Sequence, residues 1–452
     1  NAGLPRDPHL DRKNADWREN FSAVLLNPCA ERLKMSSDLA ERRAAVLGPN
    51  VPTFYDSPVH LVKGEGVWAW DADGCKYLDC YNNVPHVGHC HPHVVAAIAT
   101  QAAKLNTHTR YLHSGIVDYC ERLTAKFQTQ VDQVIMVCSG SEANDIALRM
   151  AQAMTGKTGL IATDNTYHGN TMAVSQLSSR KPPIGGYASH IRHIPAPDSL
   201  RPVGGTADGQ AAAFAQELQT AIDDLGASGH GFSGFVFCPT FANEGLPDLP
   251  RNFMKPAEQV VKAAGGILIA DEVQPGFGRC GETWWGHEWL GISPDVVTLG
   301  KPMANGHPVA AVVARAEVMA KFRSAFGYFN TFGGNPVSCA AAAATLDVIE
   351  QDNLIENAKS VGAVLLHELH SIEHPSIASR RGRGLFLALE LETDGAAGAD
   401  LAAHVVEYAR NHGLLMGRTG RNRNVLKLRP PMPFSNENVA MACDILQAAL
   451  KT

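Results

Sequence analysis

The sequence of 452 residues lacks the features that define several other classes of protein. It contains no apolar run of 18 residues, so no membrane-spanning segment is predicted. Its net charge is −6 and it has no polybasic run, which argues against nucleic acids and membrane surfaces as partners. Its ten cysteines form no Cys-x-x-Cys pair, which predicts reduced, mostly structural thiols. Charged residues throughout positions 1–30 exclude a secretory signal peptide, so we expect a cytoplasmic protein.

A metal site is not predicted either, although four histidines and a cysteine are concentrated between positions 86 and 93. Their spacings suit no standard tetrahedral zinc site, and Pro92 would break a helix that carried them. The segment is better explained as a loop that leads into a helix over residues 93–105.

The composition favours a folded chain with a large core, because 45% of the residues are hydrophobic and 19% are charged. From about position 80 to 335, short β-branched runs alternate with alanine-rich helical patterns. We expect strands at residues 134–137, 160–162, 234–237, 266–270 and 296–299. This alternation predicts an α/β fold with a mainly parallel sheet between two layers of helices.

The pattern also predicts three regions. Residues 1–80 form an N-terminal arm and a small antiparallel sheet, because positions 59–78 alternate and contain three glycines. Residues 81–338 form the large domain. Residues 339–452 form a small C-terminal α/β domain that ends in an amphipathic helix. The apolar face of that helix is expected to carry Ala442, Ile445, Leu446 and Ala449.

Two residues at the ends of predicted strands indicate the chemistry. Asp271 follows the strand at 266–270, and Lys301 follows the strand at 296–299 after a glycine. Pyridoxal phosphate requires a lysine that forms an imine and an acidic group that faces the ring nitrogen. Taken alone, Lys301 could be an ordinary solvated lysine in a loop. The other motifs that accompany it in the sequence favour the catalytic role.

One of these motifs is a strand, a glycine turn and a helix start around Gly140 and Ser141. Exposed N–H groups and a hydroxyl there predict an anion site. Taken alone, this segment would be an ordinary capped helix, and it lacks the lysine of a Walker loop. Tyr167, followed by His168, is expected to lie flat on a cofactor ring or to pack within its own domain. Further contacts of the cofactor are expected from Val273, on the other ring face, and Gln274, to the ring hydroxyl.

Together these motifs resemble the class III aminotransferase family, whose members have pyridoxal phosphate fold type I with a large and a small domain. The matching segments are residues 139–144, 167–169, 271–279, 300–302 and 331–336. The resemblance implies pyridoxal phosphate on Lys301 and a homodimer with shared active sites. It also implies that Thr331 reaches the cofactor phosphate of the neighbouring subunit.

A narrower resemblance, carried by residues 78–92, 105–113, 306–310 and 424–432, is to the ethanolamine-phosphate phospho-lyase branch. It implies elimination of phosphate from O-phosphoethanolamine to give acetaldehyde, ammonia and inorganic phosphate. The alternative is an ω-amino acid or amine:keto-acid aminotransferase. Many family members have Glu-Pro before the aspartate where this chain has Cys238-Pro239. Some aminotransferases have a second Glu where this chain has Asn243. In those enzymes this Glu moves a carboxylate-binding arginine, matched here by Arg429, out of the way.

An arginine without such a gate is free to hold an anion. We therefore expect Arg429 to bind the anionic end of a small phosphorylated amine, with help from Asn83 and Tyr111. An acid elsewhere in the chain that pairs with Arg429 would remove this argument.

Overall fold

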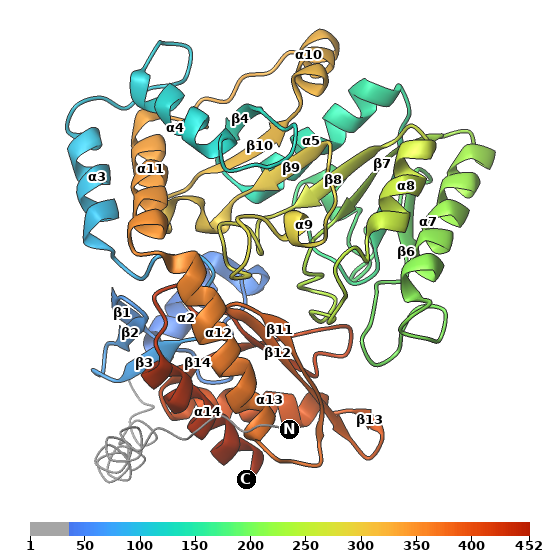
Figure 1. The fold of residues 1–452 in the computed structure, drawn as a ribbon. Helices are drawn as coiled ribbons and strands as arrows, with labels where there is room; N and C mark the ends of the chain where they lie inside the picture. The colour runs from blue at the N-terminus through green and yellow to red at the C-terminus, as the bar shows by residue number, and fades with distance from the viewer. Residues whose placement is uncertain (1–35) are drawn as a thin grey trace, which may run out of the picture.

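The computed structural model describes residues 36–452, and its upper half in Figure 1 is built on a seven-stranded sheet. The sheet order is β4 (Gln133–Val137), β10 (Ala310–Ala314), β9 (Val296–Leu299), β8 (Ile267–Asp271), β7 (Phe232–Phe237), β5 (Gly159–Thr163) and β6 (Ile191–Ile194). Strand β10 runs antiparallel to both neighbours, and the pairs from β9 to β6 are parallel. The five strands predicted from the sequence are confirmed, whereas β6 and β10 were not predicted.

Both faces of this sheet are buried, as strand β8 illustrates. Its residues Leu268 and Ala270 join the main core, and Ile267 and Ile269 join a second core. The second core includes α5 (Gly140–Thr155) and α10 (Ala316–Ala325), and the main core includes α7 (Gln210–Ala227), α8 (Lys255–Ala263) and α11 (Pro336–Gln351). Because alternate residues of a strand point to opposite faces, the predicted cover of helices on both sides is confirmed.

Two smaller sheets lie in the lower half of Figure 1. The first contains the predicted antiparallel strands β1 (Leu61–Glu65), β2 (Trp68–Asp71) and β3 (Lys76–Asp79), and β14 (Leu414–Leu415) adds to it in parallel. The second contains β11 (Ile377–Arg383), β12 (Phe386–Thr393), β16 (Val425–Leu428) and β15 (Gly417–Thr419), with β13 (Ala396–Ala397) beside β12. The division at residues 80 and 338 remains a prediction, and residues 1–35 of the predicted arm lie outside the described part.

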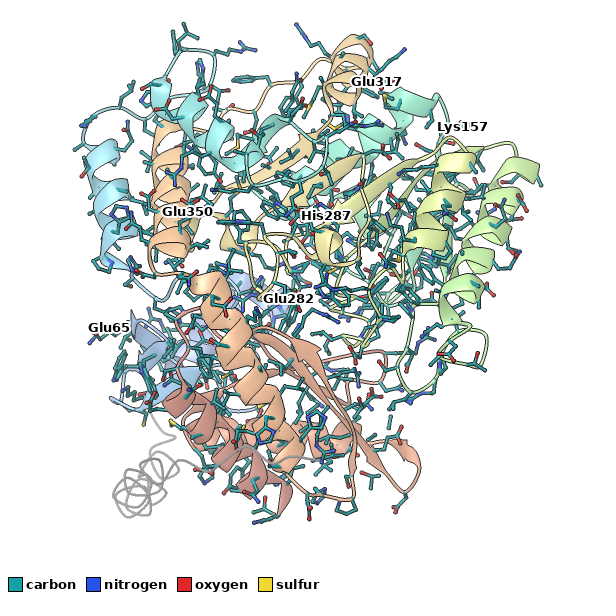
Figure 2. The ribbon with its side chains drawn as sticks, viewed as in Figure 1. Glu65, Lys157, Glu282, His287, Glu317 and Glu350 are labelled. Carbon is teal, nitrogen blue, oxygen red and sulfur yellow. The ribbon has the colours of Figure 1, made fainter. Side chains whose placement is uncertain are left out.

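The remaining helices are α2 (Ser36–Leu47), η2 (Gly48–Asn50), α3 (Pro92–Ala102), α4 (Ser114–Thr124), α6 (Met172–Ser175), α9 (Gly286–Trp289), η3 (Lys301–Ala304), α12 (Leu354–Ser371), α13 (Ala399–Asn411) and α14 (Asn436–Leu450). Helix α14 buries the four apolar residues predicted for its inner face. Within the described residues, no helix combines the length and the apolar character needed to cross a membrane. Figure 2 shows the side chains on this framework, with Lys157 at the outer edge near the end of α5.

Candidate active site

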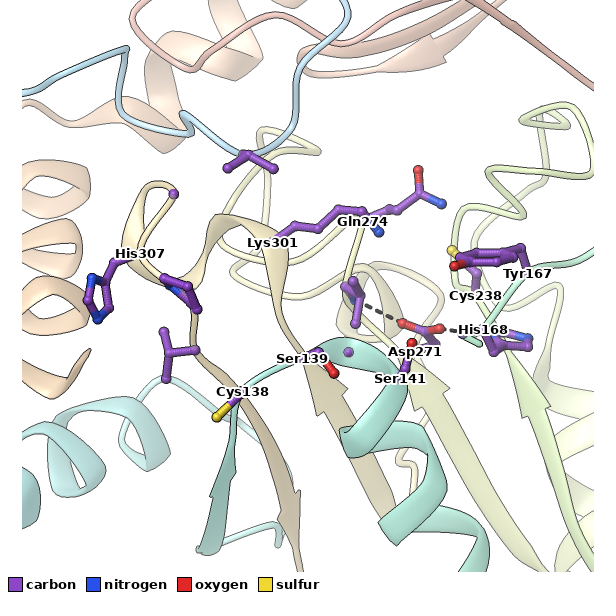
Figure 3. A pocket seen from close by; sticks show the side chains of 17 residues that line it. Cys138, Ser139, Ser141, Tyr167, His168, Cys238, Asp271, Gln274, Lys301 and His307 are labelled. Atoms are coloured by element: carbon purple, nitrogen blue, oxygen red, sulfur yellow. Dashed lines mark hydrogen bonds and ion pairs between the residues drawn. The ribbon is translucent and has the colours of Figure 1, made fainter. Parts of the chain in front are cut away.

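A pocket opens at the carboxyl ends of β8 and β9, beside the start of α5 (Figure 3). Eight of the nine residues predicted to bind the cofactor line this pocket: Gly140, Ser141, Tyr167, His168, Asp271, Val273, Gln274 and Lys301. In open parallel sheets, ligands bind at this edge because several strand ends converge there. The pocket is also lined by residues that were not predicted, among them Val84, Cys238 and His307.

The carboxylate of Asp271 is held by three hydrogen bonds. Its Oδ2 lies 2.6 Å from His168 Nδ1 and accepts from Asn144 Nδ2 at 3.0 Å, while its Oδ1 accepts from Val273 N at 3.0 Å. A carboxylate offers about four acceptor positions, so one position remains on Oδ1 for a ligand. Asp271 is 5% exposed, and its side chain is therefore both fixed and directed at the pocket.

Asn144 positions Asp271, and the sequence did not indicate this role. Its Oδ1 accepts from Thr298 Oγ1 at 2.7 Å, which orients Nδ2 toward Asp271 and toward the carbonyl of His168. The contact follows from strand alternation, because Asp271 shares a face of β8 with Ile269, which packs against α5. His168 is fully enclosed, and its Nε2 meets Thr166 Oγ1 at 3.0 Å. We infer that His168 acts on the site through Asp271.

The start of α5 leaves two backbone donors free. Ser139 and Glu142 form a complete capping box, in which Glu142 also accepts from the N–H of Cys138. Among the described residues, no partner is bonded to the N–H groups of Gly140 and Ser141, and both residues line the pocket. Free N–H groups at the start of a helix form an anion site, so the predicted phosphate position has the required donors.

Gly140 is also required for close packing at the pocket floor. A Cβ at Gly140 would lie 3.1 Å from Val273 Cγ2, which is tighter than ordinary contact.

Tyr167 is 40% exposed, and its hydroxyl donates to Asn170 Oδ1 at 3.0 Å, which fixes the ring at the pocket wall. Lys301, Asp271 and Tyr167 all line this pocket (Figure 3).

Lys301 extends its side chain into the pocket from the end of β9 (Figure 3). Its φ of +28° is unusual for a residue other than glycine, and such backbone conformations concentrate at functional sites. The side chain is accessible through the pocket opening while protein atoms surround it. Burial, together with repulsion from Arg429, lowers the pKa of Lys301 below the usual lysine value, and Asp271 opposes this effect.

Arg429 is 5% exposed and has no carboxylate partner within residues 36–452. It donates to Gln274 Oε1 and, at 3.0 Å, to the carbonyl of Tyr81. Its Nε has no partner among the described residues, and burial lowers its pKa to about 10. Asn83 contacts the backbone of the same segment as Gln274. Its Nδ2 donates to the carbonyls of Val273 and Gln274, and its buried Oδ1 has no described partner.

Four predicted site residues are not among those that line the pocket of this chain: the buried Asn83 and Arg429, and the exposed Tyr111 and Thr331. Tyr111 is 65% exposed and stacks on His108 with ring centres 5.1 Å apart. Thr331 is exposed in the segment before α11. The contact of Tyr111 and Thr331 with an active site therefore stays a prediction.

Three of the four histidines at positions 86–93 have separate structural partners, and the buried Nδ1 of His91 has none among the described residues. His86 Nε2 meets the carbonyl of Phe277 at 2.8 Å and its Nδ1 meets Arg279 at 3.0 Å, which requires the proton to be on Nε2. His89 is bonded to Asp79, and His93 is bonded to Asp347. Within the described chain, no group of three or more His, Cys, Asp or Glu residues could hold a metal ion.

Comparison with known proteins identifies the family. The model of class-III aminotransferases matches residues 52–450. The chain belongs to this family. A Drosophila melanogaster protein described as alanine–glyoxylate aminotransferase 2-like is 38% identical, with 92% of this chain and 88% of the relative covered. A Caenorhabditis elegans protein described as ethanolamine-phosphate phospho-lyase homolog 1 is 32% identical, with 92% and 94% covered.

Solved structures of family members have the same fold. A phospholyase from Arthrobacter in complex with phosphoethanolamine superposes with a TM-score of 0.88 at 41% identity, covering 92% of this chain and all of that chain. A Bacillus anthracis aminotransferase superposes with a TM-score of 0.83 at 27% identity, covering 92% and 99%. The class-III enzyme described here therefore has pyridoxal phosphate fold type I.

The cofactor of the class-III enzyme is pyridoxal phosphate, and the pocket residues fit this group. The phosphate requires anion donors, which the N–H groups at Gly140 and Ser141 provide. The ring nitrogen requires an acidic partner, which the free acceptor position of Asp271 provides. The aldehyde requires an amine, which Lys301 provides in the same pocket.

Proposed function

We propose that the class-III enzyme is a phospho-lyase that converts O-phosphoethanolamine and water into acetaldehyde, ammonia and inorganic phosphate. The observation that carries this proposal is a buried Arg429 with neutral oxygen partners and no described carboxylate partner. A buried cation without a counter-ion is costly, and an anionic substrate would supply the missing charge. The phospholyase from Arthrobacter and the phospho-lyase homologue of C. elegans support the same substrate class.

Two sequence positions at which family members can have glutamates also support this assignment. Cys238 and Asn243 occupy the places where some aminotransferases have glutamates, so neither supplies a negative charge. Burial raises the pKa of the Cys238 thiol to about 12, which keeps it protonated and neutral. The carboxylate of Asp79 acts on Arg429 but forms no ion pair with it, so the guanidinium is available to a ligand.

Pyridoxal phosphate, when bound, withdraws electrons from the substrate carbon next to nitrogen and so acidifies its proton. The Lys301 amine takes that proton, and its lowered pKa favours the neutral form that a base requires. Asp271 keeps a fixed negative charge at the pocket floor. Arg429 binds the substrate phosphate, and Gln274 and Asn83 position the arginine, since Arg429 donates to Gln274 and Asn83 donates to the carbonyl of Gln274. The phosphate leaves from the next carbon and takes the electron pair of the C–O bond. The two-carbon product then takes up water and yields acetaldehyde and ammonia.

The decisive experiment is to incubate the cofactor-loaded enzyme with O-phosphoethanolamine and no keto acid. We expect one phosphate and one acetaldehyde for each amine consumed, over many turnovers, because no amino group has to be transferred. An absolute requirement for a keto acid, with amino transfer and no phosphate release, would contradict the lyase. It would establish the alternative aminotransferase, for which the D. melanogaster relative is the precedent.

Arg429→Ala is expected to raise the KM for O-phosphoethanolamine by about tenfold or more, as the loss of a charge-assisted hydrogen bond predicts. The KM for an amine with an uncharged tail should change much less. Arg429→Gln is the matched control, because it removes the charge and retains donors for its neutral neighbours. Equal effects of these variants on charged and uncharged amines would exclude Arg429 from the phosphate site.

We also propose a homodimer, in which Thr331 contacts the cofactor phosphate of the partner subunit and Tyr111 lies near the substrate. Exposed apolar side chains near both residues, including Leu112, Phe329 and Phe332, support an interface there. Sedimentation as a monomer at all concentrations would contradict it.

The cytoplasmic location remains a prediction, and some relatives are described as mitochondrial.

A further inference from the structure

Lys427 is a buried lysine without a described partner. It is 8% exposed, and no hydrogen bond or ion pair joins its side chain to any other residue of the described chain. Its ammonium nitrogen is not among the fully enclosed atoms that lack a partner, so the nitrogen is not completely covered by protein atoms. Buried charges in proteins are normally paired or bind a ligand, and Lys427 has no pair within the described residues.

The direction of the Lys427 side chain follows from its place on β16. Leu426 and Leu428 are fully buried in the main core. Val425, on the opposite face, packs in a small cluster with Cys238, which lines the active-site pocket. Because alternate residues of a strand share a face, Lys427 points to the same side as Val425. Lys427 is therefore directed toward the pocket wall at Cys238.

The cross-strand neighbours of Lys427 are small, and an aromatic ring packs beside them. The residues directly opposite Lys427 are Ala388 on β12 and Gly417 on β15. These are the two smallest residue types, and cross-strand neighbours fill the space beside each other on a shared face. The Tyr81 ring packs against Gly417 on this face, and the carbonyl of Tyr81 accepts a hydrogen bond from Arg429, which follows Lys427 by two residues.

The charged side chains that act most strongly on Lys427 are three cations, Arg429, Lys301 and Arg180. Arg180 donates to oxygen atoms of Asn165 and Asn243, and the carboxylate of Glu244 acts on it without a hydrogen bond. Burial first, and then these three cations, hold the pKa of Lys427 well below the ordinary lysine value. These basic groups lie on the same side of the sheet as Cys238, and an anion bound among them would favour the protonated form of Lys427.

We propose that Lys427 binds the phosphate group of the substrate together with Arg429 and determines the specificity for phosphorylated amines. Arg429 contributes a planar fork of donors, and Lys427 contributes a compact charge that can follow the leaving phosphate. An amine with an uncharged tail leaves both cations unpaired and is therefore discriminated against. The identity of the anion as substrate phosphate rests on the proposed function, whereas the position of the anion site rests on the contacts above.

The test uses the cofactor-loaded enzyme and inorganic phosphate, whose dissociation constant is measured by calorimetry. Lys427→Met and Lys427→Gln remove the charge at similar side-chain length. Both are expected to weaken phosphate binding by about tenfold or more, as the loss of one charge-assisted contact predicts. The KM for O-phosphoethanolamine should rise by a similar factor. Lys157→Met, at the exposed site labelled in Figure 2, is the control for the change in net charge and should leave both values unchanged.

Thermal unfolding separates this role from a structural one. Lys427→Met should unfold at the same or a higher temperature than the natural protein, because an apolar side chain replaces an unpaired buried charge. Phosphate binding and KM that match the natural enzyme in both Lys427 variants would overturn the proposal, even if phosphate release proves the lyase. Conversely, weakened phosphate binding in these variants supports the anion site even if no phosphate is released from O-phosphoethanolamine.

Discussion

Lys301→Ala is expected to reduce phosphate release by at least about 10⁴-fold, because the variant loses both the amine that binds the cofactor and the base that removes the proton. The pocket of Lys301 supports both roles, since burial and Arg429 lower its pKa and Asp271 lies on the pocket floor. The assay is phosphate release from O-phosphoethanolamine, together with the visible absorbance of the lysine-bound cofactor, which should disappear.

Lys301→Arg is the matched control for this variant. It retains the positive charge but has no amine that could act as a base, so it should be as inactive as Lys301→Ala. Methylamine added to Lys301→Ala should restore part of the turnover, which a purely structural role of Lys301 would not allow. Normal phosphate release by either variant, with the cofactor bound, would show that Lys301 is not the catalytic lysine.

The strands that position this lysine were predictable because strands buried on both faces appear in the sequence as continuous apolar runs. Strand β6 was missed because its sequence Ile-Arg-His-Ile contains two polar residues at the edge of the sheet. Strand β10 was missed because three of its five residues are alanine, which has a weak preference for strands. In both cases the tertiary environment, and not the local pattern, determines the structure.

The same reason explains which site residues were predicted. Asp271 and Lys301 were recognised because each follows an apolar run directly. Lys427 was not, because a lysine between Leu426 and Leu428 is typical of a strand with one solvated face, whereas the structure buries both faces of β16. Asn144 lies on a helix, and only its contacts with Asp271 and Thr298 reveal its role. Contacts between distant elements therefore account for the residues that sequence patterns did not indicate.

The second large effect is expected at Asp271, where Asp271→Asn should lower kcat by about 10²–10³-fold, as the removal of a preorganised charge predicts. The change is small in volume, but it converts one acceptor into a donor. Asn144 Nδ2 already donates to one carboxylate oxygen and Val273 N donates to the other. Either orientation of an asparagine amide would therefore place two donors against each other, in addition to losing the negative charge that faces the ring nitrogen.

Thr298→Val provides the comparison that separates charge from position. It removes the hydroxyl that orients Asn144 and leaves the Asp271 carboxylate in place. We expect its kcat to fall by about tenfold at most, because the bonds from His168 and Val273 still hold the carboxylate. If Asp271→Asn lowered kcat only as much as Thr298→Val does, the orientation of the side chain would matter and its charge would not. The predicted order, with Asp271→Asn far slower, assigns the effect to the negative charge that Asp271 holds at the ring nitrogen.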